Sequence, residues 1–284
     1  LLAAGQSRSI DASYYTVVLG WIFLGVYWLS RYCARCSLHP AWGMCFALVP
    51  AVLVSIDRMT VDVALAALCV AFVYYAIEEP PSWKLYPVLA LASLARETGL
   101  LLLAAWCAWL LTRREWRRAL LYATAALPWF AWAVFVQTRT AADPVVWGKW
   151  VPLYGIAMRS LHPLRYVVPG RWMYVAAASD YLAICGVWLA LILVVAAVWK
   201  RGWQPVETAL AVFALATVFI ARADMWAETY AFGRTLSPLL LWLGMLGARD
   251  RRPLFLAPVL LVLPRILLQF AILLPAIVAG LLAR

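Results

Sequence analysis

The sequence predicts an all-α fold, a polytopic bundle of about nine or ten transmembrane segments, some of them short or broken. Of its 284 residues, 67% are hydrophobic and only 13% are charged, whereas a water-soluble chain of this length needs far more polar surface. The apolar residues also gather in blocks of roughly 20, the length that a helix needs to cross a bilayer. No polar block is long enough to fold separately, so we expect one transmembrane domain over residues 1–284.

The first three predicted segments cover residues 14–32, 41–56 and 61–77. The link after the first contains "CARC" (Cys33 to Cys36), which has the spacing of a metal or redox motif. No second Cys pair follows it and the chain has only two His, so this motif is weak evidence for a metal site. The chain opens within an apolar run without the basic start of a secretory signal, and we expect further helices upstream of residue 1.

The fourth predicted segment, residues 86–112, contains the charged stretch "SLARETGLLLLA". As one helix it would be ~40 Å long at ~1.5 Å per residue, too long for one untilted span and too short for two. Basic residues in both flanking links indicate that its two ends lie on the same side of the membrane. We therefore predict that it turns back at 96–99, where Gly99 supplies unusual backbone angles. The alternative is a single tilted helix that carries Arg96 and Glu97 in the middle of the membrane.

The remaining segments are predicted at 117–137, 175–199, 205–221, 235–248 and 253–283, the last being long enough for a kinked crossing or a hairpin. Three short links between them are densely basic: "RREWRR" (113–118), "KRG" (200–202) and "ARDRR" (248–252). An even number of crossings separates these links, so we expect all three on the cytoplasmic side. The segments 138–174 and 222–234 then lie outside.

Three polar clusters interrupt the apolar pattern, namely "SIDRMTVD", "RETG" and "RADMWAETYAFGRTLSP". Ionisable groups at membrane depth are costly and usually functional. The members that we single out are Asp57, Arg58, Asp62, Arg96, Glu97, Arg222, Tyr230 and Arg234. A structural alternative remains for each cluster: solvated loops, an acidic residue favoured at the start of a helix, or a pair that serves only stability.

The predicted outer segment 138–174 alternates aromatic residues with Lys149, Arg159, Arg165 and Arg171. Such a segment suits the lipid headgroup layer, where rings and long cationic side chains reach both apolar and polar surroundings. We expect an interfacial loop, which either anchors the chain or holds a lipid phosphate through bidentate arginines. Nucleic acid is not an expected partner, because the positive charge is divided between two membrane faces.

Short-looped helices, "SIDRMTVD" opening a helix, and "LARETGLLL" followed by a basic link resemble the GT-C superfamily of membrane glycosyltransferases. The closest likeness is to bacterial proteins that form cell-surface glycopolymers. The resemblance covers roughly residues 1–135, and its carriers are Asp57, Asp62, Arg96, Glu97, Thr98 and Gly99. It implies a GT-C-like multi-pass enzyme of the bacterial cytoplasmic (inner) membrane. It also implies a polyprenyl-phosphate-linked sugar as donor, a glycan or lipid as acceptor, and transfer at the outer face of the cell envelope.

In that family the usual catalytic acid lies in the first outer loop, which we expect upstream of residue 1, so the general base stays unassigned among Asp57, Asp62 and Glu97. The resemblance implies donor-phosphate binding by Arg58, Arg96, Arg159, Arg165, Arg222, Arg234 and Tyr230. Asp57 and Asp62 would then face the acceptor or a divalent cation. Two other functions remain open: a transporter or lipid flippase whose pathway Arg96 and Glu97 line, and a non-catalytic subunit of a polymer-export complex.

Overall fold

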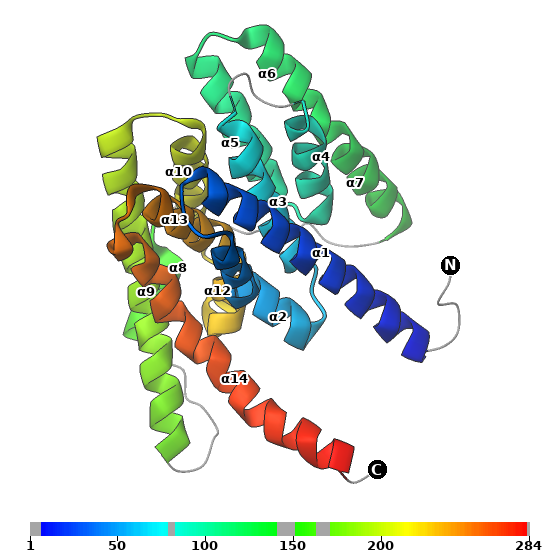
Figure 1. Cartoon of the computed structure of the whole chain (residues 1–284), viewed down its shortest axis with the longest axis vertical. Helices are drawn as coiled ribbons and strands as arrows, with labels where there is room; N and C mark the ends of the chain where they lie inside the picture. The colour runs from blue at the N-terminus through cyan, green and yellow to red at the C-terminus, as the bar shows by residue number, and fades with distance from the viewer. Residues whose placement is uncertain (1–6, 79–82, 141–150, 163–170, 283–284) are drawn as a thin grey trace.

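The computed structural model describes residues 7–78, 83–140, 151–162 and 171–282 (Figure 1). Every regular element in these ranges is a helix, which confirms the all-α prediction. Four helical stretches are long and apolar enough to cross a membrane: Ile10–Arg35, Trp116–Arg139, Arg171–Arg201 and Pro253–Phe270. A fifth is added if Pro40–Leu48 and Pro50–Arg58, which meet at a 50° bend, form one span. We therefore treat the chain as a membrane protein.

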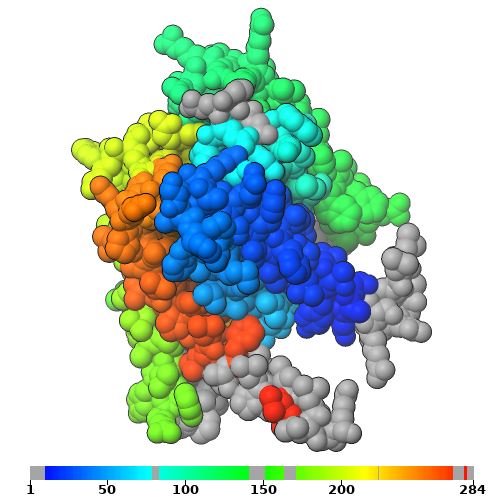
Figure 2. Space-filling view, viewed as in Figure 1, coloured from blue at the N-terminus to red at the C-terminus, as the bar shows by residue number. Residues whose placement is uncertain are grey.

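The N-terminal part is built around one central helix. Its elements are α1 (Ser7–Arg35), η1 (Pro40–Leu48), α2 (Pro50–Arg58) and α3 (Asp62–Ala76). Every residue of α3 except Tyr75 is buried, and α1 packs along both α3 and η1. Residues of α1, η1 and α2 occupy the middle of the face shown in Figure 2. A helix that is apolar on all sides and enclosed by others is typical of the interior of a membrane bundle.

The peripheral helices expose large apolar side chains, as expected where lipid surrounds the protein. Phe23 in α1 is 73% exposed, Leu120 in α6 is 71% exposed and Trp199 in α9 is 88% exposed. In water, such extended apolar surfaces mark binding sites or cause aggregation. Around a helical bundle of this composition they are the lipid-facing surface.

The 86–112 segment is broken, as predicted. It forms α4 (Leu85–Ala95) and α5 (Gly99–Thr112), which are joined by residues 96–98 and pack against each other. The rings of Tyr86, near the start of α4, and Trp106, in the second half of α5, both contact Tyr122, so the chain reverses between them. The prediction of a single tilted helix is excluded for this segment.

The predicted role of Gly99, to supply an unusual backbone angle, was wrong. Among the described glycines only Gly202 has a positive φ, so Gly99 does not supply an unusual backbone angle. Instead, a Cβ at position 99 would overlap the carbonyl oxygen of Ala92 and the amide nitrogen of Ser93. Glycine is needed there because the first turn of α5 lies directly on the last turn of α4.

The rest of the chain forms the helices that follow α5. These elements are α6 (Trp116–Ala123), η2 (Thr124–Ala126), α7 (Leu127–Arg139), α8 (Tyr154–Leu161), α9 (Arg171–Arg201), α10 (Pro205–Phe219), α11 (Ala223–Ala227), α12 (Thr229–Thr235), α13 (Ser237–Asp250), η3 (Pro253–Leu256) and α14 (Ala257–Leu282). In Figure 1, α14 begins beside α9, against which it packs, and then diverges from it toward the C-terminus. The helices α4 to α7 gather at one side of the bundle, where α4 packs against α3 and α5 packs against α10.

The three basic links predicted to share one side do lie together. Arg201 and Arg249, from two of them, both pair with Glu207 at N···O distances of 3.2 and 3.0 Å. The third link contributes Arg113 and Arg118 to a cavity that Glu207 and Arg249 also line. We call this end of the bundle the basic end. The opposite end contains the 96–98 turn and the start of α3, and we call it the turn end. That the basic end is cytoplasmic stays a prediction.

Several of the predicted segments are short, as expected, and only four or five helical stretches among the described residues are long enough to span a membrane. Helices α3, α4, α5 and α10 contain 15, 11, 14 and 15 residues, fewer than the ~20 that a lone membrane helix needs. Short helices are tolerated here because other helices enclose them and polar partners surround their ends. The turn end is one place where such partners gather.

Candidate functional site

A carboxylate shared by two arginines lies at the centre of the turn end. Asp62 is the first residue of α3, and its side chain is 5% exposed. One carboxylate oxygen accepts a hydrogen bond from Arg96, and the other lies 3.7 Å from Nη1 of Arg234. Residues from α3, the 96–98 turn and α12 are thereby brought together, although they are far apart in the sequence.

Local structure explains why Asp62 occupies this position. The preceding residue gives no side-chain cap to α3, but the hydroxyl of Ser55 in α2 accepts a hydrogen bond from the amide of Val63 (3.0 Å). An acidic residue in the first turn also suits the positive end of the helix dipole. The start of α3 is thus fixed against α2, and the carboxylate of Asp62 points to the two guanidinium groups.

Arg96 connects this carboxylate to a hydroxyl on α12. Its backbone is extended where α4 ends, so its side chain leaves the hairpin toward α12. There Nη2 lies 3.4 Å from Oγ1 of Thr235. Arg234 has a buried Nε without a hydrogen-bond partner in the described structure. Two guanidinium groups share the single carboxylate of Asp62, so N–H donors remain for an anionic ligand.

An apolar pocket of about 310 Å³ opens beside the cluster. Its polar lining comes from Arg96, Glu97, Thr98 and Thr235, whereas α5, α10 and α11 contribute only apolar side chains such as Phe219. Glu97 is exposed in the turn, unlike Asp62, and is therefore the carboxylate that a ligand in this pocket can reach. The pocket combines an arginine, a free carboxylate and an apolar wall.

The remaining candidates of the 57–58 and 222–234 segments form separate contacts. Arg58 donates to Asp57 (3.1 Å), and its guanidinium carbon lies 5.4 Å from the ring centroid of Tyr230. The hydroxyl of Tyr230 donates to the carbonyl of Ile266 (3.1 Å), which ties α12 to α14. These residues border the turn end without lining the pocket.

Arg222 forms an exposed pair with Asp224, at 2.8 Å between Nε and Oδ1. The Arg222 guanidinium hydrogen-bonds this carboxylate and holds the pKa of Asp224 below its usual range. Because both side chains are solvated, the pair resembles an ordinary surface ion pair.

Helix α8, which lies in the predicted outer segment, packs against α9, α10 and α11. Arg159 in α8 is 7% exposed and donates to Asp180 of α9 (2.8 Å). Asp180 also pairs with Arg265 of α14 (3.3 Å) and accepts a hydrogen bond from Thr229 of α12. Arg165 lies outside the described residues. Arg159 is therefore part of a buried charge cluster rather than of the pocket at Arg96.

Sequence reasoning missed Asp180, Arg265 and Glu207. The sequence does contain a signal for a buried charge cluster, because Asp180 is the single acidic residue in the 31-residue helix α9. Its partners come from helices far away in the sequence and could not be inferred. Among the described residues, no group of three or more His, Cys, Asp or Glu side chains could hold a metal ion.

Compared with known protein families, curated proteins and solved structures, the chain shows no match to any of them.

Proposed function

We propose that this chain is an integral membrane glycosyltransferase of the GT-C type, using a polyprenyl-phosphate-linked sugar. Its site would lie at the turn end, on the outer face of the membrane, in the assembly of a cell-surface glycan of a bacterial envelope. The observation that supports it best is the position of Arg96 and Glu97 at the polar edge of an apolar pocket. A lipid phosphate needs the same combination, a guanidinium for its charge and an apolar wall for its chain.

Arg96 is suited to a departing phosphate. A guanidinium carries five N–H donors, and the contacts with Asp62 and Thr235 leave others for a ligand. During transfer the bond between the anomeric carbon and the phosphate oxygen breaks, and negative charge develops on the polyprenyl phosphate. Arg96, with Arg234 behind it, would stabilise that charge, since preorganised cations act most strongly where charge develops.

Glu97 is the best placed general base. It is exposed at the pocket, whereas Asp62 is buried and already shared by two arginines. The Glu97 carboxylate would take the proton of the acceptor hydroxyl while the oxygen forms its bond to the anomeric carbon. Asp62 would be a positioning residue that holds both guanidinium groups at the pocket.

The test uses the full chain reconstituted in lipid nanodiscs with a set of polyprenyl-phosphate-linked sugars. Release of polyprenyl phosphate and labelled product are measured. We expect Glu97→Gln to lower the rate by about 10²-fold or more, as for loss of a general base. Arg139→Ala, which removes an exposed arginine from the end of α7, should leave the rate unchanged. Equal rates for Glu97→Gln and the wild type would reject this assignment.

A transporter or lipid flippase is the second candidate, and the broken elements favour it. The α4–α5 hairpin and the 50° bend between η1 and α2 both interrupt helices. Transporters built from repeats carry one broken segment in each half, whereas both breaks here lie before residue 113. Counterflow in proteoliposomes distinguishes the two: exchange of labelled lipid-linked sugar without covalent transfer would support transport.

A further inference from the structure

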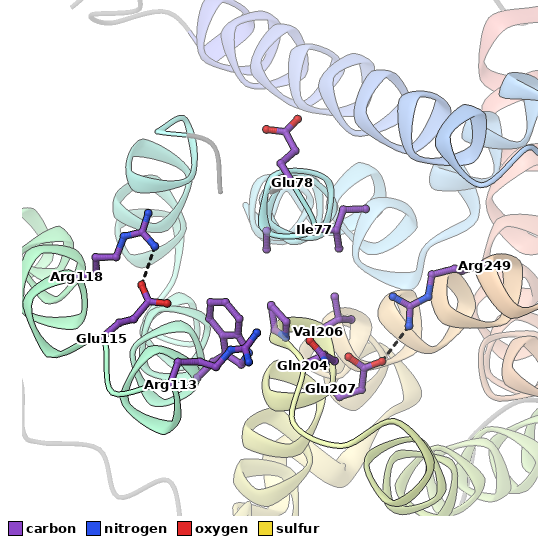
Figure 3. A pocket seen from close by; sticks show the side chains of 12 residues that line it. Ile77, Glu78, Arg113, Glu115, Arg118, Gln204, Val206, Glu207 and Arg249 are labelled. Carbon is purple, nitrogen blue, oxygen red and sulfur yellow. Dashed lines mark hydrogen bonds and ion pairs between the residues drawn. The ribbon is translucent and has the colours of Figure 1, made fainter. Parts of the chain in front are cut away.

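The basic end contains a second cavity, which is independent of the proposed transferase site. Its volume is about 460 Å³, and it lies between the ends of α3, α5 and α13 and the beginnings of α6 and α10 (Figure 3). The basic links meet around it. It is therefore formed by the whole bundle rather than by one loop.

Two buried polar atoms of the cavity lining lack hydrogen-bond partners in the described structure. One is Oε2 of Glu207, whose side chain is completely buried. Its other oxygen, Oε1, accepts from Arg201 and Arg249. The second is the indole Nε1 of Trp109. An acceptor and a donor of the cavity-lining residues are thus buried without partners, which is rare for polar atoms.

Charged side chains of both signs also line the cavity. Arg118 pairs with Glu115 (2.7 Å) and Arg249 with Glu207, as the dashed lines in Figure 3 indicate. Arg113 has no carboxylate within ion-pair distance among the described residues, and its guanidinium carbon lies 5.6 Å from the Trp109 ring centroid. The lining therefore contains one cation without a counter-charge and one carboxylate oxygen without a hydrogen-bond partner in the described structure. A compact zwitterion complements both.

The cavity lies at the depth expected for lipid headgroups. The links around it carry three exposed tryptophans: Trp83 (77%), Trp116 (61%) and Trp203 (58%). Tryptophan is enriched at the boundary between lipid and water, where its ring reaches the headgroup layer. Basic pockets between membrane helices bind the phosphate-containing headgroups of lipids such as cardiolipin. A headgroup thus fits this position better than a soluble metabolite.

We propose that this cavity binds the headgroup of a phosphatidylethanolamine from the leaflet at the basic end. The phosphate would accept from Arg113 and from Nε1 of Trp109, and the ammonium would donate to Oε2 of Glu207. Both unpartnered atoms and the cation without a counter-charge are then satisfied by one molecule. Phosphatidylcholine matches the phosphate but has no N–H group for the carboxylate.

Native mass spectrometry of the full chain in detergent, titrated with dioctanoyl lipids, tests the proposal. Phosphatidylethanolamine should bind about tenfold more tightly than phosphatidylcholine, because a hydrogen bond to a buried charge is lost with choline. Arg113→Ala should weaken phosphatidylethanolamine binding by about tenfold. Arg117→Ala removes an exposed neighbouring arginine that does not line the cavity and should have no effect.

One further variant and three further ligands distinguish phosphatidylethanolamine from other molecules that could occupy the cavity. Trp109→Phe keeps the ring and removes only the Nε1 donor, so it should weaken binding while the melting temperature stays close to that of the wild type. Equal affinity for the ethanolamine and choline lipids would overturn the proposal, as would tighter binding of phosphatidylglycerol. Soluble phosphoethanolamine that binds as tightly as the lipid would equally overturn it, because the site would then recognise a free metabolite.

Discussion

The guanidinium group of Arg96 in the α4–α5 turn pairs with the carboxylate of Asp62 at the start of α3, 34 positions earlier. This ion pair joins the hairpin to the buried central helix and places Glu97 beside the pocket. The charged residues in an otherwise apolar run are thus explained by a partner at the same end of the bundle. Stability and the proposed activity both depend on this pair.

The first prediction concerns the energy of this pair. Arg96→Ala should lower the free energy of unfolding by about 3 kcal/mol, since it leaves a buried carboxylate with only the more distant Arg234. The double variant Arg96→Ala, Asp62→Asn should recover part of that loss, because no buried charge is left. Thermal unfolding in detergent measures both. Additive losses in the double variant would show that the two side chains are not coupled.

The second prediction concerns the close contact of α4 with α5. Gly99→Ala should destabilise the protein by about 1–3 kcal/mol, because the new methyl group overlaps the backbone of Ala92 and Ser93. Gly20→Ala in α1 is the matched control. No atom lies within 4 Å of a Cβ at Gly20, and alanine is the better helix former, so this change should be neutral or slightly stabilising. Similar melting temperatures for the two variants would contradict the packing.

The sequence was sufficient to predict the helical class, the approximate ranges of the helices and the break near Arg96. These features follow from apolar periodicity and from the cost of charge within a bilayer, which are local properties. The break was correctly located, but the role of Gly99 was not. A close approach between two helices depends on their packing, which no property of a single residue reveals.

Pairing between distant helices was the part that could not be predicted. Arg159 was interpreted as a cation at the headgroup layer, since its sequence neighbours are aromatic and basic. In the structure it is buried because the carboxylate of Asp180 and the carbonyl of His162 accept hydrogen bonds from its guanidinium group. Glu207 was not singled out, because an acidic residue in the first turn of a helix is common. Only the meeting of the 200–202 and 248–252 links shows that it pairs with two arginines.

The third prediction tests the arrangement of the two ends. Single cysteines replace Trp83, Trp203 and Met59 in a Cys-free background, all three positions being at least 43% exposed. A membrane-impermeant maleimide should label positions 83 and 203 from the same side, because both lie at the basic end. Position 59 lies at the turn end and should be labelled from the other side. Labelling of positions 83 and 59 from one side would contradict the path of the chain through the membrane.

The last prediction concerns the buried cluster around Asp180. Arg159 and Arg265 are both 7% exposed, and Asp180 is the carboxylate that pairs with each of them. Asp180→Asn keeps the size of the side chain but removes its charge, so two buried cations lose their counter-charge. We expect the free energy of unfolding to fall by about 3–5 kcal/mol, the range for breaking a buried ion pair.

The matched control for this cluster is Glu228→Gln, because Glu228 is exposed at the start of α12 and lies next to Thr229 in the chain. It makes the same chemical change without removing a buried charge, so its melting temperature should stay within a few degrees of the wild type. Because the cluster connects α8, α9, α12 and α14, Asp180→Asn should also increase protease cleavage in the segments next to these helices. An Asp180→Asn variant as stable and as protected as Glu228→Gln would mean that the two arginines find other partners and that the cluster does not hold these four helices together.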